Sequence, residues 1–158
     1  MTQVSISLVL ADEAETSCLA KRLASAIQIP LNLSFKGDLG TGKTTLIRAL
    51  LRQLGVLGPI KSPTYSLVES YPVLNNQWAH HFDLYRVTDE SELDAMGFRD
   101  FFAFNTLCCI EWPEHAPSLH NQIDIVFSLS HLDAGRLLNM TAMTPVGDRI
   151  LHHLSRAT

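Results

Sequence analysis

Several features that mark other classes of protein are missing from this chain of 158 residues. It has only three cysteines, Cys18, Cys108 and Cys109, and no C-x-x-C pair. An odd number without such a pair argues against a disulfide framework and suits a reducing compartment. No apolar run is long enough for a transmembrane helix, and the amino-terminal stretch turns acidic without a basic start, unlike a signal peptide. We therefore expect a cytoplasmic protein with no membrane contact.

Basic residues are also scarce. The chain has 12 Lys and Arg against 16 Asp and Glu, which gives a formal net charge of -4. Proteins that grip nucleic-acid backbones unaided usually carry a basic face, so direct binding of RNA or DNA is not indicated. Internal repeats, low-complexity tracts and linkers are lacking too. The length is sufficient for a real core, and we expect one domain over residues 1–158.

Apolar periodicity and turn residues predict alternating strands and helices. Asp12 and Glu15 form a capping-box pattern at the start of the first helix, and Gly55 is a natural terminator for the second. Strands are expected over 4–10, 31–35, 64–73, 77–85, 107–110, 123–129 and 136–143. Further helices are expected over 44–55, 89–97, 98–104 and 146–155.

The order strand, glycine loop, helix, strand is the unit of a parallel α/β sheet. The turn residues "LNN" at 74–76 predict a hairpin whose two strands run antiparallel to the rest. We therefore expect an α/β fold: a P-loop NTPase-like three-layer α/β/α domain with a mixed, mainly parallel sheet and an inserted β-hairpin.

The stretch "GDLGTGKT" matches the phosphate-loop pattern G-x-x-x-x-G-K-[ST] at every fixed position. A strand precedes it and a helix follows, as the mechanism requires. Gly37, Gly40 and Gly42 let the backbone bend so that its N–H groups form an anion nest. Lys43 is expected to reach the β and γ phosphates, and the Thr44 hydroxyl to ligate Mg²⁺. The alternative is a glycine turn with an exposed lysine.

Two acids follow predicted strands, where the carboxyl ends of parallel strands would place them near the loop. Glu111 follows "LCCI" and is expected to bind Mg²⁺ through water, whereas Asp83 follows "WAHHF" and is expected to position water or act in a switch. Thr64, in "KSPTY", offers a hydroxyl at the place of a switch element. Lys43, Asp83 and Thr64 are thus the candidate catalytic residues. The alternatives are solvated strand-end carboxylates and a plain turn.

The sequence gives weaker signals for the identity of the nucleotide and for the roles of the histidines and cysteines. The guanine-binding pattern N-K-x-D is absent, and the D-x-x-G at 94–97 fits a helix terminus, so ATP is favoured over GTP. His80 and His81 are neighbours on a strand and point to opposite faces, which makes them poor joint metal ligands. Cys108 and Cys109 face opposite sides for the same reason and fit buried apolar positions.

The phosphate loop, "KSPTY", "HFDLYR", "ELDAMGFRD" and "IEW", in this order, resemble the bacterial tRNA threonylcarbamoyladenosine biosynthesis ATPase family, TsaE. The resemblance implies an ATPase that supports modification of the adenosine beside the anticodon in tRNAs that read codons starting with A. It implies TsaB and TsaD as partners, with TsaD transferring the threonylcarbamoyl group. Contact with tRNA would then be only indirect, through that complex.

The resemblance also assigns residues. It places Mg²⁺ on Thr44 and Glu111 and an essential acid at Asp83, and it puts Trp112 near the nucleotide or a partner. The alanine common at the position of Thr41 is replaced here, but the N–H of that residue still serves the nest. The nucleotide contacts that it implies are Glu13, Gly40, Thr41, Gly42, Lys43, Thr44, Thr45 and Gly135, with Arg136 beside the last.

Three functions remain open at this point. An accessory ATPase fits the small size of the chain. A P-loop small-molecule kinase is the alternative, although Arg86 and Arg99 are isolated and supply no arginine-rich lid. A non-catalytic module gated by nucleotide is the third.

Overall fold

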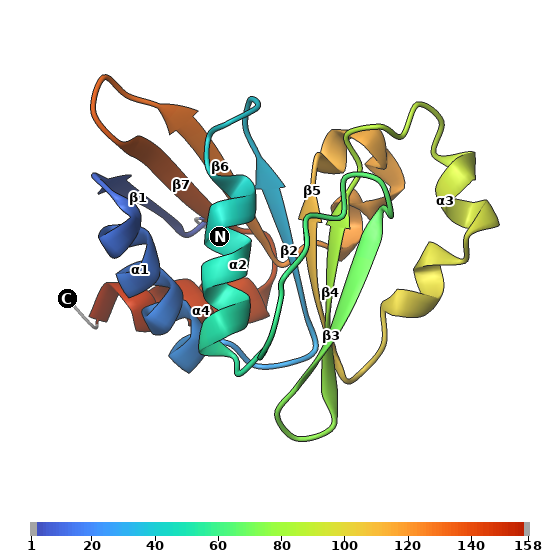
Figure 1. Ribbon diagram of the computed structural model, residues 1–158. Helices are drawn as coiled ribbons and strands as arrows, with labels where there is room; N and C mark the ends of the chain where they lie inside the picture. Colours follow the sequence, from blue (N-terminus) through green and yellow to red (C-terminus); the bar gives the residue numbers. More distant parts are fainter. Residues whose placement is uncertain (1–2, 157–158) are drawn as a thin grey trace.

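Seven strands form one mixed sheet in the computed structural model, which describes residues 3–156 (Figure 1). The spatial order is β1-β7-β6-β2-β5-β4-β3. The central strands β6, β2, β5 and β4 run parallel, and antiparallel pairs flank them on both sides. The α/β class and the mixed sheet are therefore confirmed. The strands are β1 (Ser5–Leu10), β2 (Leu31–Lys36), β3 (Val68–Val73), β4 (Gln77–Asp83), β5 (Thr106–Glu111), β6 (Ile125–His131) and β7 (Arg136–Ala142).

Helices cover the two faces of the sheet unequally. The long helices α1 (Glu13–Ala26), α2 (Lys43–Gln53) and α4 (Pro145–Arg156) share one apolar cluster with the sheet. A second cluster, on the other side of β4 and β5, is closed by α3 (Ser91–Ala95) and by short 3-10 segments. The helical layer on this second face is therefore smaller than the expected three-layer α/β/α arrangement implies. The 3-10 segments are Phe98–Phe101, Pro113–His115 and Pro117–Gln122.

The second layer is short because its segment of chain contains helix-terminating residues. Gly97 has a left-handed φ of 72° and ends α3, so the helix expected over 98–104 is only a 3-10 helix ending at Phe101. Prolines at 113 and 117 begin two further short segments. In residues 3–156, no helix has both the length and the apolar character that crossing a membrane demands.

Local signals in the sequence fix the ends of the two helices nearest the glycine loop. The Asp12 side chain accepts the Glu15 N–H at 3.0 Å, which caps α1 as expected. At the end of α2, the Val56 N–H donates to the Leu51 carbonyl and the Gly55 N–H donates to the Arg52 carbonyl, both at 3.1 Å. Gly55 has a φ of 94°, so it ends the helix in a Schellman motif.

The hairpin forms, but the directions of its strands differ from the prediction. β3 and β4 pair antiparallel, and both Asn75 and Asn76 at the turn have the positive φ that asparagine tolerates. The expectation that both strands run antiparallel to the rest is wrong for β4, which pairs parallel with β5. The two strands of a hairpin run in opposite directions, so only one of them can be antiparallel to the parallel strands of the sheet. The parallel pairing sets Asp83 directly opposite Glu111.

The first hairpin strand also starts later than expected. A turn occupies residues 64–67, where the Leu67 N–H donates to the Pro63 carbonyl at 2.8 Å and Leu67 has a φ of 68°. β3 therefore begins at Val68 and not at residue 64. Thr64 therefore lies in this turn and not in the strand.

The two adjacent cysteines lie on β5, which is buried on both faces. Cys109 joins the cluster under the long helices and Cys108 joins the cluster on the other side. Both are fully buried, so their interpretation as apolar packing residues is confirmed. Burial raises the pKa of the Cys108 thiol to about 12 and also raises that of Cys109.

These pKa shifts predict the thiol reactivity of the folded protein. A water-soluble disulfide reagent at pH 8 is expected to modify Cys18, which is exposed, and to leave Cys108 and Cys109 unmodified, because thiolates are the reactive species. Absorbance of the released reagent should report one thiol before and three after denaturation. The Cys18→Ser variant is the control and should lose the rapid reaction. Rapid modification of a second thiol in the folded protein would contradict the prediction.

Candidate functional site

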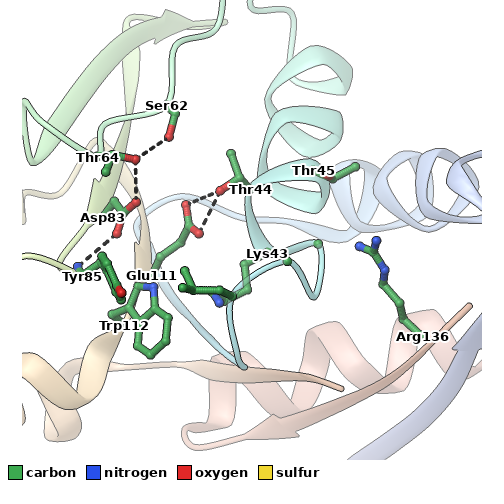
Figure 2. Close-up of a pocket in the computed structure, with 13 residues that line it drawn as sticks. Lys43, Thr44, Thr45, Ser62, Thr64, Asp83, Tyr85, Glu111, Trp112 and Arg136 are labelled. Atoms are coloured by element: carbon green, nitrogen blue, oxygen red, sulfur yellow. Dashed lines mark hydrogen bonds between the residues drawn. The ribbon is translucent and has the colours of Figure 1, made fainter. Parts of the chain in front are cut away.

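The carboxyl ends of β2, β4 and β5 meet at one edge of the sheet, where they surround a cleft of about 330 Å³ (Figure 2). Parallel strands in open α/β sheets characteristically place their ligand sites at this edge. The loop after β2 and the start of α2 form one wall. The residues that line the cleft are Leu39, Gly40, Gly42, Lys43, Thr44, Thr45, Ser62, Thr64, Asp83, Tyr85, Glu111, Trp112 and Arg136.

The glycine loop adopts a backbone path that side chains would obstruct. Gly37, Gly40 and Gly42 all have positive φ values, of 146°, 78° and 97°. A Cβ on Gly37 would collide with the Leu129 carbonyl, and a Cβ on Gly42 would collide with the Arg136 guanidinium. The loop leads directly into α2, whose first N–H groups have no partner within the helix. Its local geometry is that of an anion site at a helix N-terminus.

Lys43, the first residue of α2, is held within this loop. It is only 4% exposed, and its Nζ donates to the carbonyls of Gly37 and, at 2.9 Å, Asp38. The same Nζ lies 4.4 Å from the centroid of the Trp112 ring. Burial lowers the pKa of Lys43, and the nearby carboxylate of Glu111 opposes that shift. The site therefore keeps a cation inside the loop.

Thr44 and Glu111 are in direct contact. The Thr44 hydroxyl lies 2.9 Å from both carboxylate oxygens of Glu111 (Figure 2). A hydroxyl that donates its proton to a carboxylate still has lone pairs for a cation. Mg²⁺ is typically bound by one or two protein oxygens together with waters and phosphates, so this pair fits it. Residues 3–156 contain no cluster of three His, Cys, Asp or Glu side chains that would form a metal cage by itself.

Asp83 forms the other side of the cleft. It is 6% exposed, and its two oxygens accept hydrogen bonds from the Thr64 hydroxyl at 3.2 Å and from the Tyr85 N–H at 3.0 Å. The Ser62 hydroxyl lies 2.9 Å from that of Thr64 and extends the chain (Figure 2). Burial raises the pKa of Asp83, although the Tyr85 N–H and the Thr64 hydroxyl act against the shift. Thr64 and Asp83 thus lie together at the cleft.

The weaker sequence assignments also fall near the loop. Glu13 and Gly135 line a second cavity, of about 270 Å³, which shares Thr45 and Arg136 with the cleft. Thr41 lies in neither lining. It is 1% exposed, and its hydroxyl donates to the Asp38 carbonyl at 2.9 Å, so its side chain braces the loop from within.

Sequence reasoning missed polar residues both in the cleft lining and beside it. Ser62 and Tyr85 lie inside the motifs that contain Thr64 and Asp83, so their spacing from those residues was an available signal. For His81, the sequence pattern indicates only that it is a poor joint metal ligand with His80. Its Nε2 lies 2.6 Å from Glu111, and no single-strand pattern reveals that contact, because it joins β4 to β5.

Comparisons with known proteins identify the family of the chain. Residues 10–142 match the family model described as "Threonylcarbamoyl adenosine biosynthesis protein TsaE". The TsaE protein of Haemophilus influenzae is 42% identical over 130 residues, which cover 82% of this chain and 79% of that protein. The TsaE protein of Rickettsia bellii is 32% identical over 143 residues, which cover 89% and 98%.

A solved structure agrees in fold. The crystal structure of YdiB from Bacillus subtilis superposes with a TM-score of 0.77 at 23% identity and covers 99% of this chain and 98% of its own. The family model spans most of the chain, and the relatives match over comparable lengths. The chain therefore belongs to the TsaE family, which is named for its role in threonylcarbamoyladenosine biosynthesis on tRNA.

Proposed function

We propose that this chain binds ATP with Mg²⁺ and hydrolyses it as an accessory subunit in tRNA threonylcarbamoyladenosine formation. The observation that carries the proposal is the direct contact between Thr44 of the glycine loop and Glu111 at the end of β5, with Lys43 beside them. The role in this pathway comes from the family. The complex of TsaB and TsaD is the proposed partner, and tRNA is reached only through it.

The loop supports a P-loop-type site by both its sequence and its shape. Its backbone N–H groups and the N-terminus of α2 would bind the phosphates of the nucleotide. Lys43 would supply a cation to the β and γ phosphates, exchanging its bonds to the loop carbonyls for phosphate oxygens. Glu13, Thr45 and Gly135 border the adjoining cavity, where the rest of the nucleotide would extend.

Mg²⁺ would neutralise charge on the phosphate oxygens when bound. Thr44 would hold it directly through its hydroxyl oxygen, while Glu111, which accepts the proton of that hydroxyl, would contact the ion through water. With Thr44 as the only direct ligand from the protein, most of the coordination would be left to water and phosphate, which is the usual arrangement for this ion.

Asp83 is proposed to orient the attacking water. Its carboxylate is fixed on one side by the Thr64 hydroxyl and on the other by the Tyr85 N–H, so it has a defined direction at the cleft. The raised pKa of this buried carboxyl makes it a better proton acceptor than an exposed aspartate. Thr64 adds a hydroxyl at the same place.

A reconstitution experiment tests the function. Phosphate release should be measured with the purified chain alone and with the purified TsaB and TsaD pair, followed by tRNA modification in the complete mixture. Release of inorganic phosphate without an acceptor supports the ATPase. Phosphate found on a small molecule would favour the kinase alternative. Repeated rounds of modification with a variant that binds but does not hydrolyse ATP would favour the non-catalytic module.

Loss of the loop cation should weaken nucleotide binding. Lys43→Ala is expected to reduce ATP affinity roughly 10- to 100-fold, since hydrogen bonds to charged groups contribute about 1.5–3 kcal/mol. Isothermal titration calorimetry with ATP and Mg²⁺ measures the effect. Arg48→Ala is the matched control, because Arg48 is an exposed cation on the same helix that does not line the cleft. Equal losses in the two variants would contradict the assignment.

Replacing the proposed water-orienting acid should separate binding from chemistry. Asp83→Asn is expected to lower the hydrolysis rate about 10²- to 10⁴-fold while ATP affinity stays within a few-fold of the wild type. Single-turnover phosphate release gives the rate, and calorimetry gives the affinity. Asp89→Asn is a suitable control, because Asp89 lies outside the cleft. Unchanged hydrolysis in Asp83→Asn would remove Asp83 from the mechanism.

The same substitution should affect stability with a defined pH dependence. The pKa of Asp83 is raised above its ordinary value of 3.8, so its contribution to stability is present below pH 3.8 and is lost as pH rises through the folded-state pKa. Asparagine does not titrate. The free energy of unfolding of Asp83→Asn, relative to that of the wild type, should therefore rise as the pH increases from 3.8 toward neutral. Urea unfolding across this range measures it.

A further inference from the structure

A residue of the neighbouring strand β4 also contacts Glu111. The His81 side chain on β4 is fully buried, and its Nε2 lies 2.6 Å from the Glu111 Oε2, whose side chain is 4% exposed. The other ring nitrogen, Nδ1, is buried and has no hydrogen-bond partner in residues 3–156. A buried polar atom without a partner is uncommon in native structures and requires an explanation.

The contact with His81 matters because the Glu111 carboxylate has few donors. The Thr44 hydroxyl lies within reach of both oxygens but carries only one proton. His81 supplies a separate N–H to Oε2, in addition to the proton that Thr44 supplies. A buried carboxylate left short of donors costs free energy, roughly 1–3 kcal/mol or more for a charged group.

The orientation of the imidazole follows from the same contacts. Nδ1 faces no acceptor, so a proton placed there would be an unsatisfied buried donor, and the N–H is assigned to Nε2. The ring is enclosed, and this fixes the direction of its donated hydrogen bond. His81 therefore determines which way the Glu111 carboxylate faces relative to Thr44.

We propose that His81 is a positioning residue for Mg²⁺ binding, acting through Glu111. The proposal rests on the function proposed above. His81 does not lie in the lining of the cleft, so it would contact neither nucleotide nor metal. It would instead keep one oxygen of Glu111 occupied, so that the carboxylate stays aligned on Thr44 and on a metal-bound water. Loss of a hydrogen bond of this kind typically costs 10- to 100-fold in metal affinity.

The neighbouring histidine provides a matched control. His80 is also buried, but it points to the opposite face, where Nδ1 lies 2.7 Å from the Ser70 hydroxyl and the ring packs edge-on against Phe101. Substitutions at the two positions therefore remove the same side chain from the same strand. Only those at residue 81 disturb Glu111.

The test compares His81→Leu, His81→Phe and His81→Gln with His80→Leu. Calorimetry with ATP over a series of Mg²⁺ concentrations gives the half-saturating Mg²⁺ concentration, and ATP titration without metal gives the metal-independent affinity. The two apolar variants should raise the Mg²⁺ requirement about 10- to 100-fold and leave the metal-free affinity nearly unchanged. His81→Gln retains an N–H donor and should recover most of the loss, and His80→Leu should keep the wild-type requirement. Thermal melting confirms that each variant is folded.

Several outcomes would overturn the proposal. A wild-type Mg²⁺ requirement in a folded apolar variant would leave His81 only a structural role, as would failure of His81→Gln to recover any of the loss. Nitrogen NMR of the wild-type imidazole needs no variant, and a proton on Nδ1 instead of Nε2 would contradict the assigned hydrogen bond. Absence of any ATP binding by the wild type would instead overturn the proposed function itself.

Discussion

The rest of the site depends on one buried carboxylate. Glu111 ends a strand that is covered on both faces, and its side chain is almost completely removed from water. A charge in that position requires hydrogen-bond donors. Thr44 supplies one from the start of α2, and His81 supplies another from β4. These two hydrogen bonds connect Glu111 on β5 with the glycine loop on one side and with the hairpin on the other.

The direction of the strands places the second acid. β4 runs parallel to β5, so Asp83 and Glu111 leave the sheet at the same edge and in register. Had the hairpin been reversed, with its second strand antiparallel to β5, Asp83 would lie at the far end of the sheet from the glycine loop. The turn over 64–67 then returns Thr64 to the Asp83 carboxylate, and the Asp83 N–H donates to the Leu67 carbonyl at 3.0 Å. Backbone topology thus brings two motifs that are separated in the sequence together on one side of the cleft.

Signals that act within a few residues were predictable from the sequence, and contacts between strands were not. The Asp12 cap, the Gly55 terminator and the strand-loop-helix order around Gly37 are local, and each agrees with the structure. The direction of β4 and the contact of His81 with Glu111 depend on which strands become neighbours. No periodicity within one strand contains that information. The ends of the predicted strands and the family resemblance both indicated Asp83 and Glu111, but neither assigned a role to His81 on β4.

The glycine loop illustrates how a site can be ordered before it binds anything. Lys43 is a buried cation whose hydrogen bonds go to the loop's own carbonyls and whose charge lies over the Trp112 ring. Thr41 braces the loop through Asp38. A phosphate that bound there, as proposed, would therefore not have to order the loop, because folding has already ordered it. In the proposed function, Lys43 would exchange these carbonyl acceptors for charged phosphate oxygens, which form stronger hydrogen bonds with an ammonium group. That difference would favour the phosphate-bound arrangement over the contacts that Lys43 makes within the loop.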